Sequence, residues 1–469
     1  MTVLQYIMSD TSIEHDDSSI TTCDTNTSLE LISSMEYDTT IDEHILSDLE
    51  SDIYIEVDDY TKSNLLDYSS PQFSDKLKEY VTNTIIEATM HAGLCGDTFA
   101  NRREITMLVQ HVIDCYFHSA QIYPVRSYSP DVSVSDLIHP HSTAYIQNKI
   151  QELKSQPQPV QRTTEWYEMR HDCITASNIY KALGSPAQMN QLIYEKCLPL
   201  TRSTTESAPN TNSPTHWGVR YEPVTTAIYE AKYPGNRVDT EFGCIRHPQY
   251  SFIGASPDGI VVSGPRVGHM LEIKNTVSRE ISDIPVPYHW IQCQVQMETC
   301  GLDYCDYIQT NIQEVERDTF YGCGNAYSEG QRRSPEEYED NLSEYKGIIL
   351  YLISRKEGAA NYKYLYMPLD FPEITPQIVQ SWTNIQMSVY GDEYLLFETL
   401  YWVLKHVSCV IIPRNRDWFQ AALPKFKQLW DTVEYERIHG YEHRMPKKRE
   451  TRSSKPNQAL LVSLLDHDD

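Results

Sequence analysis

Two short stretches, Ser256-Pro257-Asp258-Gly259 and Leu271-Glu272-Ile273-Lys274, decide the fold that this sequence predicts. The first is typical of a tight turn at the end of a strand, where Gly259 allows a backbone twist. The second is typical of a strand, in which Glu272 and Lys274 share a face because strand side chains alternate. A hairpin that joins the two stretches brings Asp258 beside Glu272.

This pair of carboxylates with a nearby ammonium group predicts metal-assisted chemistry. Adjacent carboxylates repel unless a divalent cation neutralises them, and Mg²⁺ prefers oxygen ligands while keeping several waters. The cation can polarise a scissile phosphate and activate water, and Lys274 can orient that water or offset developing negative charge. The pattern therefore predicts attack on a phosphodiester. The alternative is an exposed salt-bridge ladder, which contributes about 0.2–1 kcal/mol per pair.

Apolar spacing around the two stretches predicts helices and strands in an order that defines a fold class. The expected order is helix, strands, helix, strand, which implies an α/β (α+β) core with a mixed central sheet flanked by helices. The first helix begins near Thr164, whose hydroxyl can cap it. The other expected elements are a helix over 221–233, β-rich segments over 243–262 and 270–277, a helix over 290–300 and a strand over 304–310.

Five motifs follow one another over residues 163–310, about a third of the chain. They are Trp166-x-x-x-Arg170 with Ile174-Thr175-Ala176-Ser177, then Trp217-Gly218-Val219-Arg220-Tyr221-Glu222-Pro223, Gly254-Ala255-Ser256-Pro257-Asp258-Gly259, Leu271-Glu272-Ile273-Lys274 and Gln292-Cys293-Gln294-Val295-Gln296. Together they resemble the lambda-exonuclease family, also called YqaJ-like viral recombinases, of the PD-(D/E)XK nuclease superfamily. The resemblance implies a restriction-endonuclease-like core.

The resemblance also implies roles for individual residues. Arg170 and Ser177, together with Gln294, are expected to bind DNA at a 5′ phosphate. Gln292 is the expected active glutamine, beside the catalytic Asp258, Glu272 and Lys274, and Glu222 is the expected third carboxylate. The implied ligands of Mg²⁺, or of Mn²⁺ as a substitute, are Asp258, Glu272, Glu222 and the backbone carbonyl of Ile273.

Each auxiliary residue also has a purely structural interpretation. Arg170 could be a solvated helix residue, and Ser177 could cap the helix that follows it. Glu222 could be a first-turn acid favoured by the helix dipole. Gln292 and Gln296 lie four positions apart, so one could simply hydrogen-bond the other.

Segments outside the core have their own compositions. Residues 1–75, rich in Ser, Thr and Asp, predict an acidic and mostly disordered tail, and helical spacing predicts an accessory region over 76–150. The nuclease core is expected over 163–370 and a C-terminal helical region, rich in Trp and Tyr, over 371–440. Residues 441–469 are expected to be a flexible tail, basic and then acidic, in which 447–452 could serve nuclear import, bind phosphate or simply be solvated.

Charge and cysteine content limit the class of protein. The formal net charge is −27, which argues against phosphate binding, but residues 1–70 hold 17 Asp or Glu and one lysine, so the remainder can still carry a basic groove. The eleven cysteines form no C-x-x-C pair, which predicts reduced thiols in an intracellular protein. No apolar run approaches the roughly 20 residues that span a bilayer, so no membrane partner is expected.

The residues predict a magnesium-dependent nuclease, and the resemblance implies a deoxyribonuclease that acts on double-stranded DNA ends as a 5′-to-3′ exonuclease. The resemblance implies recombination, repair or processing of viral DNA at a replication site in the host cytoplasm or nucleus, with a single-strand annealing protein as a fitting partner. The appended segments leave the family's oligomer open. The alternatives are a structure-selective or nicking endonuclease with the same centre, and an inactive DNA-binding or scaffold protein that keeps a nuclease-like core.

Overall fold

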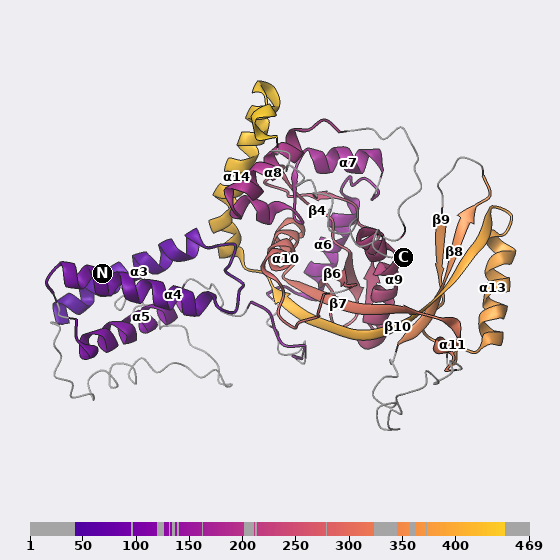
Figure 1. The fold of residues 1–469 in the computed structure, drawn as a ribbon, viewed down its shortest axis with the longest axis horizontal. Coiled ribbons are helices and arrows are strands. Elements are labelled where there is room, and N and C mark those ends of the chain that lie inside the picture. Colours follow the sequence, from indigo (N-terminus) through magenta and orange to yellow (C-terminus); the bar gives the residue numbers. More distant parts are fainter. Residues whose placement is uncertain are drawn as a thin grey trace, which may run out of the picture.

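The structure of the 469-residue chain is a computed structural model (Figure 1). A group of helices lies at one end of the molecule, a sheet-centred body in the middle, and a smaller unit of strands and helices at the other end. The described residues are 43–94, 97–119, 126–130, 132, 133, 137, 140–161, 163–200, 211, 213–277, 279–322, 345–356, 362–371 and 373–445.

The three N-terminal helices pack on one another through apolar stripes. They are α3 (Glu43–Ser63), α4 (Phe73–His91) and α5 (Phe99–Ser119). The predicted disordered tail up to residue 75 is therefore wrong for residues 43–63. Ile53 and Val57 lie one helical turn apart and are fully buried, while the many acidic residues of α3 occupy its other faces. The expectation for residues 1–42 lies outside the described residues.

A seven-stranded mixed sheet, in the order β2-β5-β6-β7-β10-β8-β9, runs through the body of the molecule. Within this sheet only the β6–β7 pair is parallel; the other neighbours are antiparallel. The predicted mixed sheet flanked by helices is confirmed. The strands are β2 (Arg237–Asp239), β5 (Gly259–Ser263), β6 (Met270–Asn275), β7 (Tyr304–Val315), β8 (Lys346–Ser354), β9 (Tyr362–Tyr366) and β10 (Tyr394–Pro413).

A second sheet of three short strands lies beside the first and carries the approach to the Asp258 turn. Its order is β1 (Ile174–Thr175), β4 (Ile253–Ala255), β3 (Ile245–Arg246), with β1 parallel and β3 antiparallel to β4. Because β4 ends at Ala255 and β5 begins at Gly259, the chain passes from the small sheet to the large one through the turn that holds Asp258.

Helices cover both sheets. α9 packs on β6 and β7, α10 on the small sheet and on β7, and α14 beyond α10, while α13 covers β8 and β9 at the far end (Figure 1). The helices are α6 (Thr143–Ser155), α7 (Thr164–His171), η2 (Ile179–Leu183), α8 (Pro186–Cys197), α9 (Pro214–Lys232), α10 (Pro287–Cys300), α11 (Arg317–Phe320), α13 (Pro376–Tyr390), α14 (Arg416–His439) and η3 (Glu442–Arg444), of which η2 and η3 are 3₁₀ helices.

The prediction that residues 371–440 are helical is wrong in its middle. Residues Tyr394–Pro413 form β10, a 20-residue strand that lies between β7 and β8 in the large sheet. The large sheet therefore extends past the boundary that was expected for the core at residue 370. The Trp and Tyr residues of the segment 394–413 are compatible with either a helix or a strand. The segment forms a strand because it pairs with β7 and β8, which lie far away in the sequence. Of the predicted tail over 441–469, residues 446–469 lie outside the described residues.

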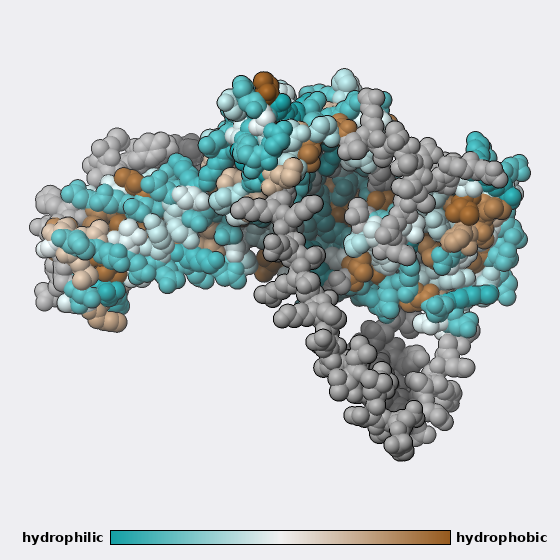
Figure 2. Space-filling model, turned by 45° about the horizontal axis from the view of Figure 1, so that its top comes forward, coloured by the Kyte–Doolittle hydropathy of each residue, from teal (hydrophilic) through white to brown (hydrophobic). Residues whose placement is uncertain are grey.

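Most of the visible surface is hydrophilic, with apolar side chains gathered at the end that holds α13 and β8–β10 (Figure 2). Exposed apolar residues of that end include Ile385, Val389 and Phe397. Among the described helices, none is both long and apolar enough to cross a membrane.

Candidate active site

Asp258 is held against β6 by a backbone hydrogen bond. The amide of Ile273 donates to its Oδ2 over 2.7 Å, and Gly259 pairs with Leu271 across the β5–β6 ladder. The predicted hairpin therefore does bring the aspartate beside the E-x-K strand. The reason for Gly259 differs from the predicted twist, because a Cβ there would lie 2.6 Å from Val238 Cγ1.

Glu272 and Lys274 point to the same side of β6, as the alternation of strand side chains predicts. Lys274 Nζ donates to Glu272 Oε1, and also to Gln292 Oε1 at 3.4 Å. Leu271 and Ile273 lie on the other face, in an apolar cluster. Glu272 is 0% exposed, so an exposed salt-bridge ladder does not describe this strand.

A buried glutamine that the sequence analysis did not assign to the site holds the second oxygen of Glu272. Gln296 Nε2 donates to Glu272 Oε2 over 2.8 Å and lies 3.4 Å from the carbonyl oxygen of Ser256. Gln292 contacts Lys274 instead. The two glutamines therefore each bond a residue of β6, and the alternative in which one merely bonds the other does not apply. The signal that could have found Gln296 is its position one helical turn after Gln292.

Asp258, Glu272 and Lys274 line one cavity of about 440 Å³, which Gln292 of α10 and Glu222 of α9 also line. α9 is tied to β6 below the cavity: the hydroxyls of Thr225 and Thr310 each donate to Asn275 Oδ1 over 2.6 Å, and Asn275 Nδ2 donates to the carbonyl of Gly218 over 3.1 Å. The predicted site residues that line this cavity are Glu222, Asp258, Glu272, Ile273, Lys274 and Gln292.

The charges in the cavity disfavour the ionised form of Asp258. Burial, and then the negative charges of Glu272 and Glu222, raise its pKa well above the ordinary value. Burial opposes the charge on Lys274, but Glu272 and Asp258 outweigh it and raise the pKa of this lysine. A bound cation stabilises carboxylates whose negative charges repel one another in this way.

The donor set suits a cation that keeps much of its water. Among the described residues, no group of three or more His, Cys, Asp or Glu is arranged to hold a metal ion, so Glu222, Asp258 and Glu272 do not form a closed three-carboxylate site. Asp258 and Glu272 provide carboxylate oxygens on one hairpin beside an open cavity. Mg²⁺ is commonly bound by one or two carboxylates with water and substrate oxygens filling its other positions, and the residues present fit that pattern.

A second group of polar side chains lies where the small sheet approaches the Asp258 turn. Arg170 stacks on Trp166 at 4.4 Å from the ring centroid, and its guanidinium lies 3.4 Å from Ser256 Oγ and 3.5 Å from Ser177 Oγ. Burial lowers the pKa of Arg170. Arg170 is therefore not a solvated helix residue. The role of Ser256 in this group was not predicted.

Two local predictions about caps differ from the structure. α7 is capped by Thr163, whose side chain accepts from the amide of Trp166, and not by Thr164. Ser177 does not cap the short helix that follows, which begins after Asn178 without a side-chain cap bond. Its hydroxyl lies 3.2 Å from that of Thr175 and close to Arg170.

The predicted role of Gln294 in phosphate binding is wrong. Its side chain is 1% exposed, donates to the carbonyl of Pro413 over 2.8 Å and accepts from the amide of Asn415 over 2.7 Å. Gln294 lies two residues from Gln292 and Gln296, so helical geometry places it on the opposite face of α10. There it holds the connection between β10 and α14.

Further polar residues that were not predicted complete the cavity wall. Arg279 Nη2 donates to Gln309 Oε1 over 2.9 Å, and His289 Nδ1 lies 2.7 Å from the hydroxyl of Tyr307. Burial, with Lys274 and Arg279 nearby, lowers the pKa of His289 to about 2, which keeps the imidazole neutral. His289 precedes Gln292 by three positions on α10, and that spacing could have found it.

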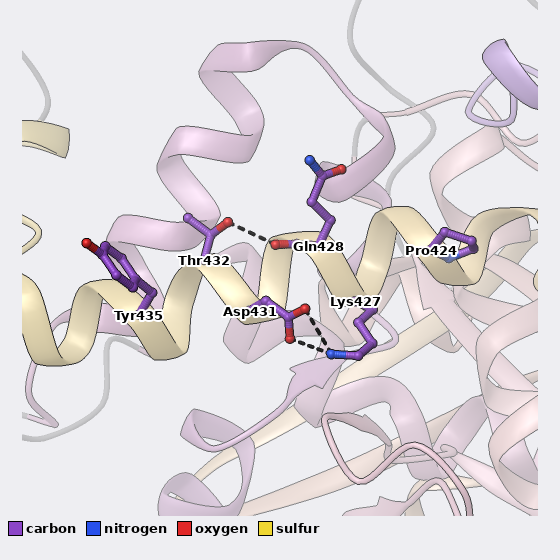
Figure 3. Close-up of a pocket in the computed structure, with 6 residues that line it drawn as sticks. All are labelled: Pro424, Lys427, Gln428, Asp431, Thr432 and Tyr435. Atoms are coloured by element: carbon purple, nitrogen blue, oxygen red, sulfur yellow. Dashed lines mark hydrogen bonds and ion pairs between the residues drawn. The ribbon is translucent and has the colours of Figure 1, made fainter.

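Another hollow, of about 570 Å³, runs along the outer face of α14 and is a different kind of surface (Figure 3). All the residues that line it belong to this one helix. They make contacts within it: Lys427 pairs with Asp431 at 2.6 Å, and the hydroxyl of Thr432 donates to the carbonyl of Gln428 over 2.9 Å. No carboxylates from separate elements converge there, so we assign no chemistry to it.

Comparisons with known proteins agree with the resemblance found in the motifs. Residues 165–303 match the family described as the YqaJ-like viral recombinase domain, and the predicted resemblance is confirmed over that range. "Uncharacterized protein R354" of Acanthamoeba polyphaga mimivirus is 27% identical over 350 residues, which cover 67% of this chain. The chain spans 60% of the length of that curated relative.

Solved structures of one bacterial enzyme are also similar. The alkaline exonuclease LHK-Exo from Laribacter hongkongensis is 18% identical with a TM-score of 0.33, and the match covers 59% of this chain and 95% of that one. The same enzyme in complex with dAMP is 19% identical with a TM-score of 0.32, over the same shares of the two chains.

Proposed function

Taking residues 165–303 to be a YqaJ-like viral recombinase domain, we propose that the protein is a nuclease that hydrolyses DNA phosphodiester bonds with a bound divalent cation. The observation that carries the proposal is the buried carboxylate of Glu272 on β6, which accepts hydrogen bonds from Lys274 and Gln296. The same strand binds the carboxylate of Asp258 through the amide of Ile273. A purely structural salt bridge between Glu272 and Lys274 would not require Asp258, a second buried carboxylate whose pKa is raised by burial and by Glu272.

The predicted site residues that line the cavity have distinct roles in this proposal. Asp258 and Glu272, with the Ile273 carbonyl, would hold Mg²⁺ or Mn²⁺, and Glu222 would act through a bound water. When bound, the cation supplies Lewis acidity toward the scissile phosphate and its attacking water. Lys274 holds its proton and offsets negative charge on the phosphate, while Gln292 fixes the position of its ammonium group.

The group around Arg170 supports action at a DNA end. A guanidinium with serine hydroxyls on two sides suits the bidentate binding of a terminal phosphate, and Arg170 lies next to Ser256, two residues from Asp258. We therefore favour a 5′-to-3′ exonuclease over an endonuclease with the same centre. Binding of this kind positions DNA without reading its sequence.

The resemblance to the family also supports a proposal for the biological process in which the protein acts. A DNA end-processing nuclease fits recombination, repair or processing of viral DNA inside an infected cell, and a single-strand annealing protein would be a natural partner for the single strand that it leaves. The helices α3–α5 and the β8–β10 unit are large enough to alter any contact between subunits.

The first experiment compares linear duplexes that carry 5′-phosphate or 5′-hydroxyl ends, with Mg²⁺ or with EDTA. We expect wild-type protein to degrade the phosphorylated duplex only with the metal, and Lys274→Met to lose at least about a hundredfold in rate. The matched control is Lys405→Met, because Lys405 is exposed on β10. Equal rates for the two variants would rule out the assigned centre.

A covalently closed plasmid separates the proposal from its two rivals. An exonuclease leaves the closed circle intact and degrades it after linearisation, whereas an endonuclease opens it directly. A DNA-binding protein with an inactive core would retain the linear duplex in a mobility-shift assay and leave it uncut after Mg²⁺ is added.

A further inference from the structure

A separate cavity of about 280 Å³ lies where the N-terminal helices meet the nuclease body. Ser69 and Pro71 line it from the segment before α4, Arg126 and Ser127 from the segment after α5, and Ile284 and Pro285 from the segment before α10. It therefore joins three parts of the chain that are far apart in the sequence. None of its lining residues belongs to the predicted catalytic set.

Arg126 contributes a partly buried positive charge to this cavity. Its guanidinium lies 5.5 Å from the ring centroids of both Tyr68 and Phe73, and its Nη2 donates to Ser74 Oγ over 3.3 Å. The indole of Trp290 donates to its carbonyl over 2.8 Å, which fixes its backbone against α10. Arg126 is thus held in place from both sides of the junction.

The charge on Arg126 has no counter-ion among the residues that the structure describes. Within that part of the chain, no carboxylate lies at ion-pair distance from its guanidinium, and its buried Nε atom makes no hydrogen bond. Burial lowers the pKa of Arg126, as expected for a cation that has lost water. A partly desolvated cation in this state is stabilised when an anion accompanies it.

Ser69 provides a second polar group without a protein partner. Its side chain is 5% exposed, and its hydroxyl, which is buried, makes no hydrogen bond to any described residue. Buried hydroxyls in folded proteins are nearly always hydrogen-bonded. Two unsatisfied donors of this kind on one cavity indicate a ligand that accepts hydrogen bonds.

The cavity is next to the catalytic one along the chain. Ile284 and Pro285 lead directly into α10, which begins at Pro287, and Tyr288, His289 and Gln292 of that helix line the catalytic cavity. Pro71 lies two residues before α4, so the positive end of that helix dipole is also close by. The start of α10 therefore borders both cavities, because Trp290 lines the one that holds Arg126.

We propose that Arg126 and Ser69 bind a phosphate group of the DNA strand, one that lies beyond the catalytic cavity and past the start of α10. The proposal rests on the proposed nuclease function and gives the N-terminal helices a part in substrate binding. Phosphate is the anion that a guanidinium binds with paired N–H donors, and a serine hydroxyl is a common additional donor to DNA phosphates. Exposed Ile284 would then face the sugar of the same nucleotide.

The test measures binding of full-length protein to a fluorescent, 5′-phosphorylated duplex in EDTA, at salt concentrations from roughly 50 to 200 mM. We expect Arg126→Gln to bind about tenfold more weakly, and the slope of log Kd against log salt to fall by about 0.9, the contribution of one phosphate. Ser69→Ala should weaken binding by about threefold. Arg237→Gln is the matched control, because Arg237 is 74% exposed and pairs with Glu230.

The outcomes distinguish this inference from the proposed function. If wild-type protein cleaves DNA but Arg126→Gln keeps the salt slope of Arg237→Gln, the phosphate site is refuted and the nuclease stands. If wild-type protein neither binds nor cleaves DNA, the nuclease itself fails. Should Arg126→Gln not fold, Ser69→Ala decides: wild-type affinity in that variant would overturn the site.

A second arm separates a strand phosphate from free phosphate. Inorganic phosphate is added to wild-type protein and to Arg126→Gln, and the unfolding temperature of each is followed. Stabilisation of wild-type protein alone, together with the loss of salt slope in Arg126→Gln, supports the site. The same stabilisation with unchanged DNA slopes would mean that the cavity takes free phosphate, which overturns the assignment to DNA.

Discussion

Glu272 is the residue on which the candidate site depends most. One of its oxygens accepts from Lys274 and the other from Gln296, so both are engaged although the side chain is fully buried. A buried carboxylate needs such partners, because an unpaired one costs several kcal/mol. The same contacts fix the carboxylate in the wall of the cavity that Asp258 also lines.

Gln296 is predicted to act by positioning Glu272. Gln296→Met removes the donor to Glu272 Oε2, and we expect the nuclease rate to fall about 10- to 100-fold and the Mg²⁺ concentration for half-maximal rate to rise. Gln294→Met is a matched control on the opposite face of α10, which should lower stability yet keep the metal dependence. Equal shifts in metal dependence for both variants would contradict the positioning role.

The raised pKa of Asp258 predicts how stability depends on pH without metal. The folded protein keeps the proton of Asp258 to a higher pH than the unfolded chain, whose ordinary value is about 3.9. Between those two pKa values the folded state binds more protons, so the free energy of unfolding falls as pH rises, by at most about 1.4 kcal/mol per pH unit. This stability is fully present below the unfolded pKa and is lost as pH rises through the folded one.

Denaturant unfolding in EDTA over a series of pH values measures this dependence. Asp258→Asn should flatten the curve and be more stable than wild-type protein at neutral pH, because it removes the buried charge. The exposed Asp318→Asn serves as the control and should keep the wild-type slope. A wild-type slope in Asp258→Asn would show that another group is responsible.

At the scale of elements, α10 illustrates how one helix serves two structural tasks. Gln292 and Gln296 lie one turn apart and face β6, whereas Gln294 faces the connection from β10 to α14. The motif Gln292-Cys293-Gln294-Val295-Gln296 contains three glutamines, and helical periodicity alone divides them into two faces. Which face meets the carboxylates depends on how α10 packs between the two sheets.

The tie between α9 and β6 is predicted to set the place of Glu222. Asn275→Ala removes one acceptor for two threonine hydroxyls and one donor to Gly218. We expect the free energy of unfolding to fall by about 1–3 kcal/mol, and a higher Mg²⁺ concentration to be needed for cleavage. Asn384→Ala, on the exposed side of α13, should change neither quantity. Unchanged metal dependence in Asn275→Ala would separate Glu222 from the metal.

At the scale of the whole molecule, the N-terminal helices share a continuous apolar core with the sheet-centred body. Aromatic rings form the junction: Tyr68 lies 5.7 Å from Trp290, and Trp290 lies 5.1 Å edge-on from Trp418 of α14. The indole of Trp418 also donates to the carbonyl of Leu65 over 3.1 Å. The helices α3–α5 are therefore part of the folded body and bring Arg126 to the proposed phosphate site.

Loss of this junction is predicted to loosen the N-terminal helices selectively. Trp418→Ala should lower the free energy of unfolding by about 3–5 kcal/mol and accelerate amide hydrogen exchange in α3–α5 more than in β7. Trp430→Ala is the comparison: Trp430 is also buried on α14, but its indole bonds Glu434 within that helix. Equal acceleration in α3–α5 for the two variants would argue against a junction centred on Trp418.

Local patterns in the sequence were sufficient for the central hairpin. The alternation of Leu271, Glu272, Ile273 and Lys274 on one strand, and the turn that contains Asp258, depend on neighbours in the chain, so they could be predicted from short-range rules. The same holds for the order of helices and strands in the core and for the placement of Arg170 one turn after Trp166.

Only the tertiary structure decided which polar residues meet and which elements the ambiguous segments form. Glu272 of β6 meets Gln296 of α10, and Gln294 meets Pro413 at the end of β10, although each pair lies on separate elements. β10 is a strand because it pairs with β7 and β8, and the burial of α3 likewise depends on α4 and α5. Periodicity determines which residues share a face of an element, whereas long-range packing determines what that face contacts.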